Sequence, residues 1–312
     1  AMTGLRRNGA IAPGGSCRIL PCADGHVAVN LARDSDWQSL DAWLQTPTNP
    51  DWDSVMHRVR GCDRNTLIER ARLLELAVVD AQPGTAEVNH WFAVNHAVAR
   101  ARLPSKPARV IDLSSLWAGP LCGLLLQQVG CEVIKVQGSQ RPDGARLGSP
   151  AFFDFLNGGK QQLTLDLHTT AGRHALRELL QDADIIIESS RPRALRQMGI
   201  HAEQLLQEIP GLTWVSITGY GRQEPEANWI AYGDDAGVAA GLSALMHTIT
   251  GRWMFCGDAI ADPLTGIHAA LAALADWRTG GGRLLSLSLV GTVQFCITYS
   301  NNVRQQTNPD RR

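Results

Sequence analysis

Two arginines stand where they could bind the phosphates of a small molecule. Arg141 and Arg146 lie in a turn-rich stretch, residues 138–150 (GSQRPDGARLGSP). A guanidinium group matches the geometry of a phosphate, so this loop could hold a nucleotide. Arginines in such a loop are, however, more often solvated surface residues.

Two aspartates, Asp258 and Asp262, precede an alanine-rich segment whose apolar spacing predicts a helix over residues 263–278. An aspartate just before a helix commonly caps it, because its carboxylate accepts hydrogen bonds from free N–H groups of the first turn. Proline also suits the first helical position, which Pro263 would occupy. From the residues alone, capping and a chemical role are about equally well supported for Asp262.

Other common chemistries have little support in the sequence. It contains neither GxGxxG nor GxxxxGK[ST], the usual dinucleotide and P-loop signatures. The nine histidines form no HExxH or similar spacing, so we expect no metal site. The cysteines are odd in number and form no CxxC pair, which predicts reduced thiols that mostly pack as small hydrophobic residues. They are Cys17, Cys22, Cys62, Cys122, Cys131, Cys256 and Cys296.

From residue 109 onward, strand and helix patterns alternate. Residues 110–113 and 132–136 are apolar runs of strand length, and the spacing between them predicts a helix with Pro120 in its first turn. Further strands are predicted at 163–167, 184–188, 212–218 and 283–289, with helices at 169–182, 192–209, 234–246 and 263–278 and a short helix at the end. This alternation predicts a Rossmann-like α/β fold, with a mostly parallel sheet covered by helices and ligands at the carboxyl ends of its strands.

The N-terminal third has a different pattern. Residues 17–31 predict a hairpin that turns at Asp24-Gly25, and helices are predicted at 34–44 and 65–79. We expect the tryptophans of this region to form its core rather than a binding face: Trp37, Trp43 and Trp52. The chain is therefore predicted to consist of a small α+β domain with a linker, residues 1–103, and a large α/β domain, residues 104–312.

Charge and hydropathy limit the partners. The 29 basic and 30 acidic residues give no general electrostatic argument for binding nucleic acid or an anionic membrane. No apolar run reaches the roughly 18 residues of a membrane-spanning helix, and residues 1–15 lack the apolar core of a signal peptide. We therefore expect a cytoplasmic protein without nucleic-acid or membrane partners.

The order of motifs between Val110 and Leu289 resembles the large domain of the class III (CaiB/BaiF-type) coenzyme A transferases. IDLSSLWAGP, EVIKV, a basic loop, NGGK and LTLDLHTTAGR are followed by ADIIIESSRPRALRQMGI, GLTWVSITGYG, ADPLTGIHAALAAL and WRTGGG. The N-terminal unit resembles the small domain of that family, which normally follows the opening half of the large domain. The resemblance therefore implies a circularly permuted order, which folds tolerate where the cuts fall in exposed loops.

The resemblance also implies an activity and a set of site residues. Enzymes of this family move coenzyme A (CoA) between carboxylic acids through an aspartyl-CoA intermediate, and their D-x-x-x-G pattern maps to Asp262, as the nucleophile, and Gly266. A carboxylate is a weak nucleophile, so such a site must hold it against the thioester and stabilise the oxyanion with backbone N–H groups. The implied CoA contacts are Leu116, Trp117, Ala118, Arg141, Arg146, Leu165, His168, Ser189, Ser190 and Met198, although packing or capping is as well supported for most of them.

Tyr232 matches a position beside the active site of this family. In its α-methylacyl-CoA racemases that position is a histidine, one of two opposed acid/base groups, so Tyr232 favours a transferase over a racemase or isomerase. Several positions depart from the family pattern: Gln137, Gly158, Gln161, Ser189, Gln197, Gly233 and Ser286. These departures keep a third possibility open, a non-catalytic CoA-binding or structural subunit. The family further implies an interlocked homodimer, acyl-CoA and a carboxylic acid as substrates, and no metal.

Overall fold

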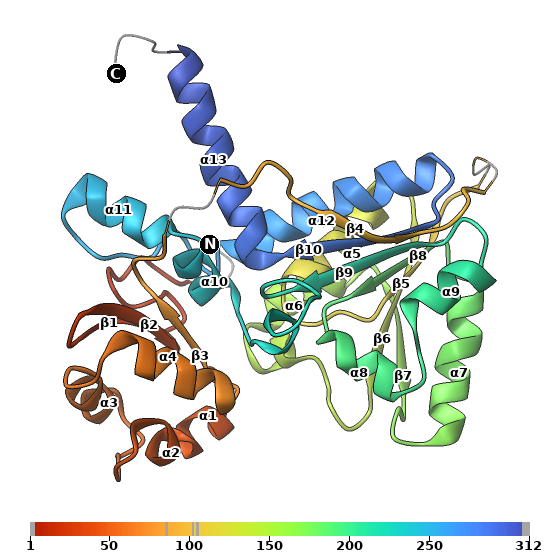
Figure 1. Ribbon diagram of the computed structural model, residues 1–312. Coiled ribbons are helices and arrows are strands. Elements are labelled where there is room, and N and C mark those ends of the chain that lie inside the picture. The colour runs from red at the N-terminus through yellow and green to blue at the C-terminus, as the bar shows by residue number, and fades with distance from the viewer. Residues whose placement is uncertain (1–3, 85–86, 102, 104–105, 308–312) are drawn as a thin grey trace. The chain divides into compact units, whose positions relative to one another are not determined.

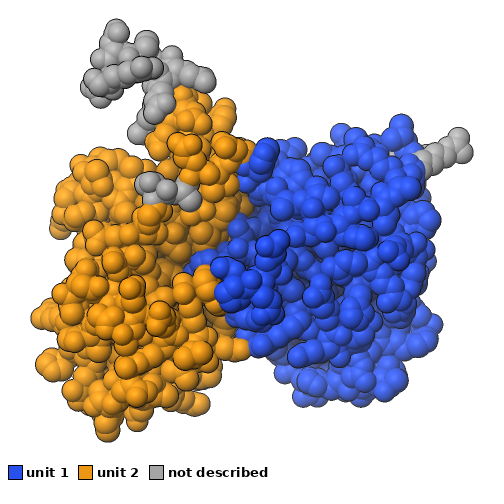
Figure 2. All heavy atoms as spheres, viewed as in Figure 1, with its two compact units in different colours: residues 1–4, 90–228, 262–288 blue, residues 5–89, 229–261, 289–312 orange. Residues whose placement is uncertain are grey.

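The computed structural model describes residues 4–84, 87–101, 103 and 106–307. The chain forms two compact units, each assembled from segments that are distant in the sequence (Figure 2). The first unit comprises Ala1–Gly4, His90–Asn228 and Asp262–Ser288; the second comprises Leu5–Asn89, Trp229–Ala261 and Leu289–Arg312. The second unit thus adds residues 229–261 and 289–312 to most of the predicted small domain, and the boundary at residue 103 stays a prediction.

A seven-stranded sheet is the centre of the first unit (Figure 1). Its strands are β4 (Ala93–Ala97), β5 (Arg109–Asp112), β6 (Glu132–Gly138), β7 (Gln161–Leu165), β8 (Ile185–Glu188), β9 (Thr213–Thr218) and β10 (Arg283–Ser288). The order is β4-β10-β9-β8-β5-β6-β7, and all neighbours pair in parallel except the edge strand β4, which is antiparallel to β10. The predicted mostly parallel α/β sheet is confirmed. Strand β4 was not predicted.

Helices flank this sheet (Figure 1). They are α5 (Ala118–Gln128), α6 (Pro150–Asn157), α7 (Thr170–Gln181), α8 (Pro192–Gln197), α9 (Ala202–Glu208) and α12 (Ala261–Arg278), with short 3-10 helices η1 (Gly144–Leu147) and η2 (Glu226–Asn228). Thr169 caps α7 as expected, because its hydroxyl accepts a hydrogen bond from Gly172 N at 3.0 Å. The prediction of one helix over 192–209 was wrong: the chain turns at Gly199, with φ of 77°, and continues as α9.

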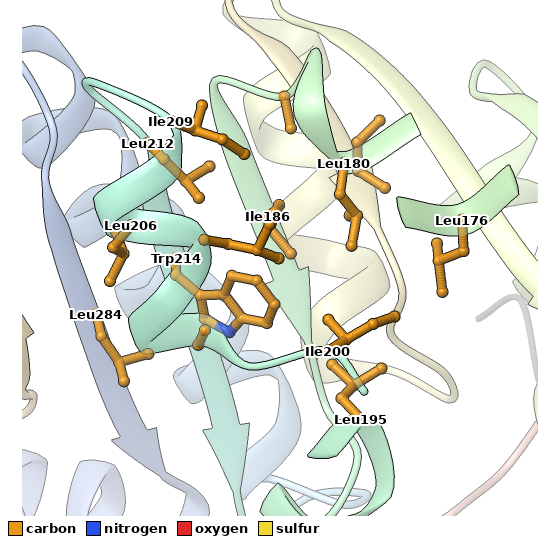
Figure 3. Packing of buried hydrophobic residues seen from close by; sticks show 14 of the residues in the cluster. Leu176, Leu180, Ile186, Leu195, Ile200, Leu206, Ile209, Leu212, Trp214 and Leu284 are labelled. Carbon is orange, nitrogen blue, oxygen red and sulfur yellow. The ribbon is translucent and has the colours of Figure 1, made fainter. Parts of the chain in front are cut away.

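The core of the first unit lies between the sheet and helices α7, α8 and α9 (Figure 3). Ile185, Ile186 and Ile187 of β8 are completely buried. A central parallel strand that is covered on both faces needs such a continuous apolar run, which is why DIIIE predicts this strand well. Trp214 of β9 fills the space between α9 and β8, and its indole N–H donates to Glu188 Oε1 at 3.1 Å.

The second unit contains an antiparallel sheet, β1 (Cys17–Cys22), β2 (Gly25–Asn30) and β3 (Ala77–Asp80), in that order. The hairpin and the tryptophan core are confirmed. Trp43 is fully buried and donates to Leu67 O at 2.9 Å, and the rings of Trp37 and Trp52 meet edge to face at 5.2 Å. The helices are α1 (Asp34–Gln38), α2 (Leu40–Leu44), α3 (Trp52–Val59), α4 (Arg64–Leu73), α10 (Gly233–Ala239), α11 (Leu242–Thr250) and α13 (Leu289–Thr307).

Four predicted helices of the second unit differ from the structure. The helix over 34–44 is divided at Ser39 into α1 and α2. The helix over 65–79 ends at Leu73, because Glu75 takes a left-handed φ of 56° and the following β-branched residues form β3. The helix over 234–246 is divided into α10 and α11 at Gly241, which has φ of 95°. The terminal helix α13 has 19 residues rather than one or two turns.

Candidate active site

The strand order of the large sheet reverses beside β5. From β5 the chain proceeds outward to β6 and β7 and then returns to β8 on the other side of β5. In doubly wound sheets ligands bind at the carboxyl ends of the strands at such a switch point. A hydrogen bond from Ser115 N to Ser189 Oγ, 3.0 Å long, joins the segments that follow β5 and β8. The structure therefore places Ser189 beside the turn that the sequence assigned to CoA.

The turn after β5 has an unusual backbone. Leu116 has φ of 69°, in the left-handed region that branched side chains rarely occupy, and its side chain is 42% exposed. Trp117 follows as the N-cap residue of α5, and its ring meets the edge of Phe152 at 4.9 Å. Trp117 thus packs against α6, the structural role that was weighed for it, while Leu116 faces solvent.

Helix α12 approaches this turn very closely. A Cβ atom at Gly266 would lie 2.6 Å from the carbonyl oxygen of Ala118 and 3.0 Å from Leu121 Cβ, so no larger residue fits between the two helices. Asp262 is in the first turn of α12, one helical turn or about 6 Å along the axis before Gly266. Asp262 is half-buried. The contact of α12 with α5 is therefore one helical turn away from the candidate nucleophile.

The two loop arginines are exposed, but Arg146 is anchored. Its guanidinium donates to Gln162 Oε1 at 2.7 Å and to Gln137 Oε1 at 3.3 Å, and lies 4.0 Å from the ring centre of Phe153. Both glutamines belong to neighbouring strands, β6 and β7. Arg146 is therefore held over this edge of the sheet. Arg141 lies in the turn directly after β6, where its N–H donates to Gly138 O at 3.3 Å, and its side chain is exposed.

The remaining predicted CoA contacts are more scattered. Leu165 and Met198 pack partly against the large core, which fits the structural role considered for them. His168 is exposed after β7, two strands from β5 and so about 10 Å across the sheet. Ser190 follows Ser189 at the carboxyl end of β8 and is half-buried. The Ser115–Ser189 hydrogen bond thus joins the turn after β5 to the end of β8, and the Gly266 contact joins α5 to the helix that carries Asp262. Of the other predicted CoA contacts, His168 lies two strands from β5, and Leu165 and Met198 pack against the core.

Tyr232 lies in the second unit, at the N-cap of α10, directly before Gly233 and two adjacent aspartates, of which Asp235 is buried and Asp234 is half-buried. Asp235 is completely buried and accepts hydrogen bonds from Asn30 Nδ2 at 2.7 Å and from Tyr232 N at 3.1 Å. Burial raises the pKa of Asp235 to about 7. Asp234 accepts from Ala259 N at 2.9 Å, and burial, assisted by the nearby Asp258, raises its pKa to about 6.

These two aspartates are not among the predicted site residues. They directly follow Gly233, one of the positions that depart from the family pattern. Two adjacent acidic residues at the start of a helix are a weak signal, because carboxylates are favoured in any first turn. Asp235 is bonded to Asn30 of strand β2, which lies 205 positions earlier in the chain. A contact between residues so far apart cannot be recognised from the sequence.

Four buried charges beneath the turn after β5 were also missed. Lys160 Nζ lies 2.8 Å from Asp112 Oδ2, and Lys135 Nζ lies 2.9 Å from Asp143 Oδ2; all four side chains are at most 1% exposed. Burial alone would raise the pKa of Asp112, but the charges of Lys160 and Lys135 outweigh it and lower that pKa. The only sequence signal was a lysine within the apolar run EVIKV, since a lysine in a buried strand needs a partner.

A third buried ion pair fixes the end of β8. Glu188 Oε1 accepts from Arg222 at 2.7 Å, and the same guanidinium nitrogen donates to Ser216 Oγ at 2.8 Å. Burial raises the pKa of Glu188, and the charge of Arg222 opposes that rise. The pair anchors the strand end directly before Ser189, at the switch point.

Within the described ranges, no cluster of three or more His, Cys, Asp and Glu side chains could hold a metal ion. All seven cysteines are free thiols. In the same part of the chain, no helix combines the length and the apolarity that crossing a bilayer requires.

Comparison with known proteins identifies a single family. Residues 106–311 match the family model described as CoA-transferase family III. A succinyl-CoA:glutarate CoA-transferase of Mus musculus is 31% identical over 244 residues, which cover 72% of this chain and 55% of the mouse protein. A succinate–glutarate CoA-transferase of Agrobacterium fabrum is 30% identical over 217 residues, covering 64% of this chain and 54% of that protein. The chain spans about half the length of these curated relatives.

Solved structures give the same result. Rv3272 of Mycobacterium tuberculosis is similar with a TM-score of 0.58 and 26% identity, over 68% of this chain and 60% of that one. A CAIB/BAIF family protein of Brucella suis is similar with a TM-score of 0.52 and 25% identity, over 68% and 59% of the two chains.

Proposed function

Since the chain belongs to CoA-transferase family III, we propose that it transfers coenzyme A between an acyl-CoA and a free carboxylic acid. The observation that carries this proposal is the close approach of α12 to α5 at Gly266. Asp262 lies one helical turn before this contact, which supports a nucleophile near the turn of residues 116–118, where the strand order of a nucleotide-binding type of sheet reverses.

In the proposed reaction the Asp262 carboxylate attacks the thioester carbonyl. The carbon–sulfur bond breaks, CoA leaves as a thiolate, and the acyl group stays on Asp262 as a mixed anhydride. The thiolate then attacks the aspartyl carbonyl, which releases the first carboxylic acid and leaves aspartyl-CoA; the second acid reverses both steps. Asp262 lies in the first turn of an 18-residue helix, and the positive end of the helix dipole stabilises an ionised carboxylate there.

The other predicted site residues are proposed to bind CoA or to orient the acyl group. The backbone of the turn of residues 116–118 and the exposed Leu116 side chain would border the proposed CoA position, and Ser189 is bonded to the residue before this turn. Arg141 and Arg146 lie on the loop that would face the phosphates. We propose Tyr232 as a second catalytic residue, which orients the acyl group. Two relatives are named for succinate and glutarate, so dicarboxylic acids are the first substrates to try.

We further propose that the protein is cytoplasmic, that it forms an interlocked homodimer, and that its order is circularly permuted. The balanced charge and the absence of a CxxC pair support a cytoplasmic location. The permuted order is supported by the composition of the second unit, in which the N-terminal sheet packs with residues 229–261 and with α13.

Assays of CoA transfer with matched variants test the activity. Asp262→Asn is expected to lower kcat by about a thousandfold or more, because removing a catalytic nucleophile usually has an effect of that order. Asp258→Asn removes a neighbouring carboxylate from the loop before α12 and should stay within roughly tenfold of the wild type. Transfer by Asp262→Asn at the wild-type rate, on succinyl-CoA or glutaryl-CoA with a panel of acceptor acids, would contradict the proposal.

A further inference from the structure

The charged groups buried beneath the turn after β5 each hold a backbone atom of that turn or of α5. Asp112 accepts hydrogen bonds from the N–H of Ser114, at 3.0 Å, and from its hydroxyl. Lys135 Nζ donates to Ser114 O, and Lys160 Nζ donates to Pro120 O at 2.8 Å. The backbone from Ser114 to Pro120 is thus attached to the sheet by side chains of three different strands or loops.

Asp143 occupies a special place in this group because it joins two loops. Its Oδ1 accepts from Leu116 N at 2.9 Å and from Ala145 N at 3.0 Å, while its Oδ2 lies 2.9 Å from Lys135 Nζ. Leu116 belongs to the proposed CoA turn, and Ala145 belongs to the arginine loop. A single buried carboxylate therefore sets the position of both chain segments that would enclose the nucleotide part of CoA.

Stability alone does not account for this arrangement. Burying an ion pair removes two charges from water, and its net contribution to folding is often near zero, so apolar residues would stabilise the fold at least as well. The left-handed φ of 69° at Leu116 also costs energy and persists only where surrounding contacts fix it. The hydrogen bond from Leu116 N to Asp143 is a contact of that kind.

We propose that Asp143 is a positioning residue for CoA, which acts by holding the backbone at Leu116 and the arginine loop in the geometry that the ligand requires. This inference rests on the proposed function. A change at Asp143 should therefore alter the affinity for CoA and leave the reaction at Asp262 unaffected.

Two double variants isolate the hydrogen bond without leaving an unpaired buried charge. Lys135→Met/Asp143→Asn keeps an acceptor oxygen at the position of Oδ1, and Lys135→Met/Asp143→Leu has the same net charge and nearly the same shape but no acceptor. Affinity for free CoA is measured by calorimetry well below the melting temperature of either variant. We expect the Leu variant to bind CoA about tenfold more weakly than the Asn variant, since a lost hydrogen bond to a buried group has an effect of this order. In steady-state transfer the KM for acyl-CoA should differ between the two variants by a similar factor. Their kcat and their KM for the acceptor acid should be equal.

The outcomes separate this inference from the proposed function. Equal CoA affinity in the two variants, with binding intact in the wild type, would overturn the positioning role, even if both variants had lost stability. No CoA binding by the wild type would instead contradict the proposed function. If the Leu variant does not fold, hydrogen exchange of the wild type decides: CoA should protect the peptides around Leu116 and Ala145 together, and protection of neither would overturn the inference.

Discussion

At the scale of single residues, the candidate active site depends on a missing side chain as well as on those that are present. The absence of a side chain at Gly266 allows α12, which carries Asp262, to contact the Ala118 carbonyl of α5. Leu116 contributes an exposed apolar side chain from a backbone conformation that most residues avoid.

This packing predicts the effect of one added methyl group. In Gly266→Ala the Cβ would lie 2.6 Å from backbone oxygen, which cannot move as a flexible side chain could, so α12 must shift away from α5. We expect a loss of about 1–3 kcal/mol in the free energy of unfolding, as for other overpacked sites, and a lower rate of CoA transfer.

The control is Gly14→Ala, where an added Cβ meets nothing within 4 Å. Urea unfolding and a transfer assay on the same preparations measure both properties. A Gly266→Ala protein with the stability and activity of the Gly14→Ala control would show that the close approach of the two helices is not needed.

The residues of the site differ in how well the sequence predicts them. Asp262 and its glycine belong to a local pattern, so the family resemblance alone was sufficient to propose them. Asp143 and Lys160 act through partners that are 27 and 48 positions away, and their roles depend on burial that emerges only when the sheet has formed. For Arg146 the phosphate contact stays a prediction, and the two glutamines that anchor its side chain could not be recognised from the sequence, because they belong to neighbouring strands.

At the scale of elements, the strands were predicted more reliably than the helix ends. A buried parallel strand such as β8 carries its signal in a continuous apolar run, whereas helices α8 and α9 share one apolar period and differ only by the turn at Gly199. Strand β4 escaped prediction because it is an edge strand whose residues are mostly exposed, so it lacks the apolar run that marks the inner strands.

Helix α10 provides a prediction about pH, because the buried Asp235 joins it to strand β2. The folded-state pKa of Asp235, about 7, exceeds the ordinary value of 3.8, so between these values the folded protein binds a proton that the unfolded chain releases. Stability must therefore fall as the pH rises through this window. Asp235→Asn removes that dependence, since an amide is neutral throughout and its oxygen can still accept from Asn30 and Tyr232.

Between about pH 5 and about pH 8 the free energy of unfolding of the wild type should fall by on the order of 2 kcal/mol more than that of Asp235→Asn. The cause is that the buried carboxyl group of the wild type becomes charged when it loses its proton. Denaturant unfolding at several pH values measures the difference. Asp234 titrates in both proteins, so only the gap between the two curves is attributed to Asp235. Parallel curves would contradict the assignment of a raised pKa to this carboxyl group.

At the scale of the whole molecule, the family resemblance inferred from the order of motifs is confirmed by the match of residues 106–311 to CoA-transferase family III. The α/β architecture follows from the same alternation of strands and helices. The composition of the second unit could not be predicted, because it combines three segments that only tertiary packing brings together.

The central claim is that Asp262, in the large sheet unit, carries CoA during turnover. Cleavage after Arg252 and Arg278 yields a peptide, residues 253–278, that contains Asp258, Asp262 and Asp276. The protein is incubated with succinyl-CoA and quenched with hydroxylamine, and fragmentation of this peptide locates the hydroxamate that forms from an activated carboxyl group. The account predicts the modification on Asp262 alone and none without acyl-CoA. Modification of Asp258 or Asp276 in its place, or an unmodified peptide under conditions in which CoA is transferred, would contradict it.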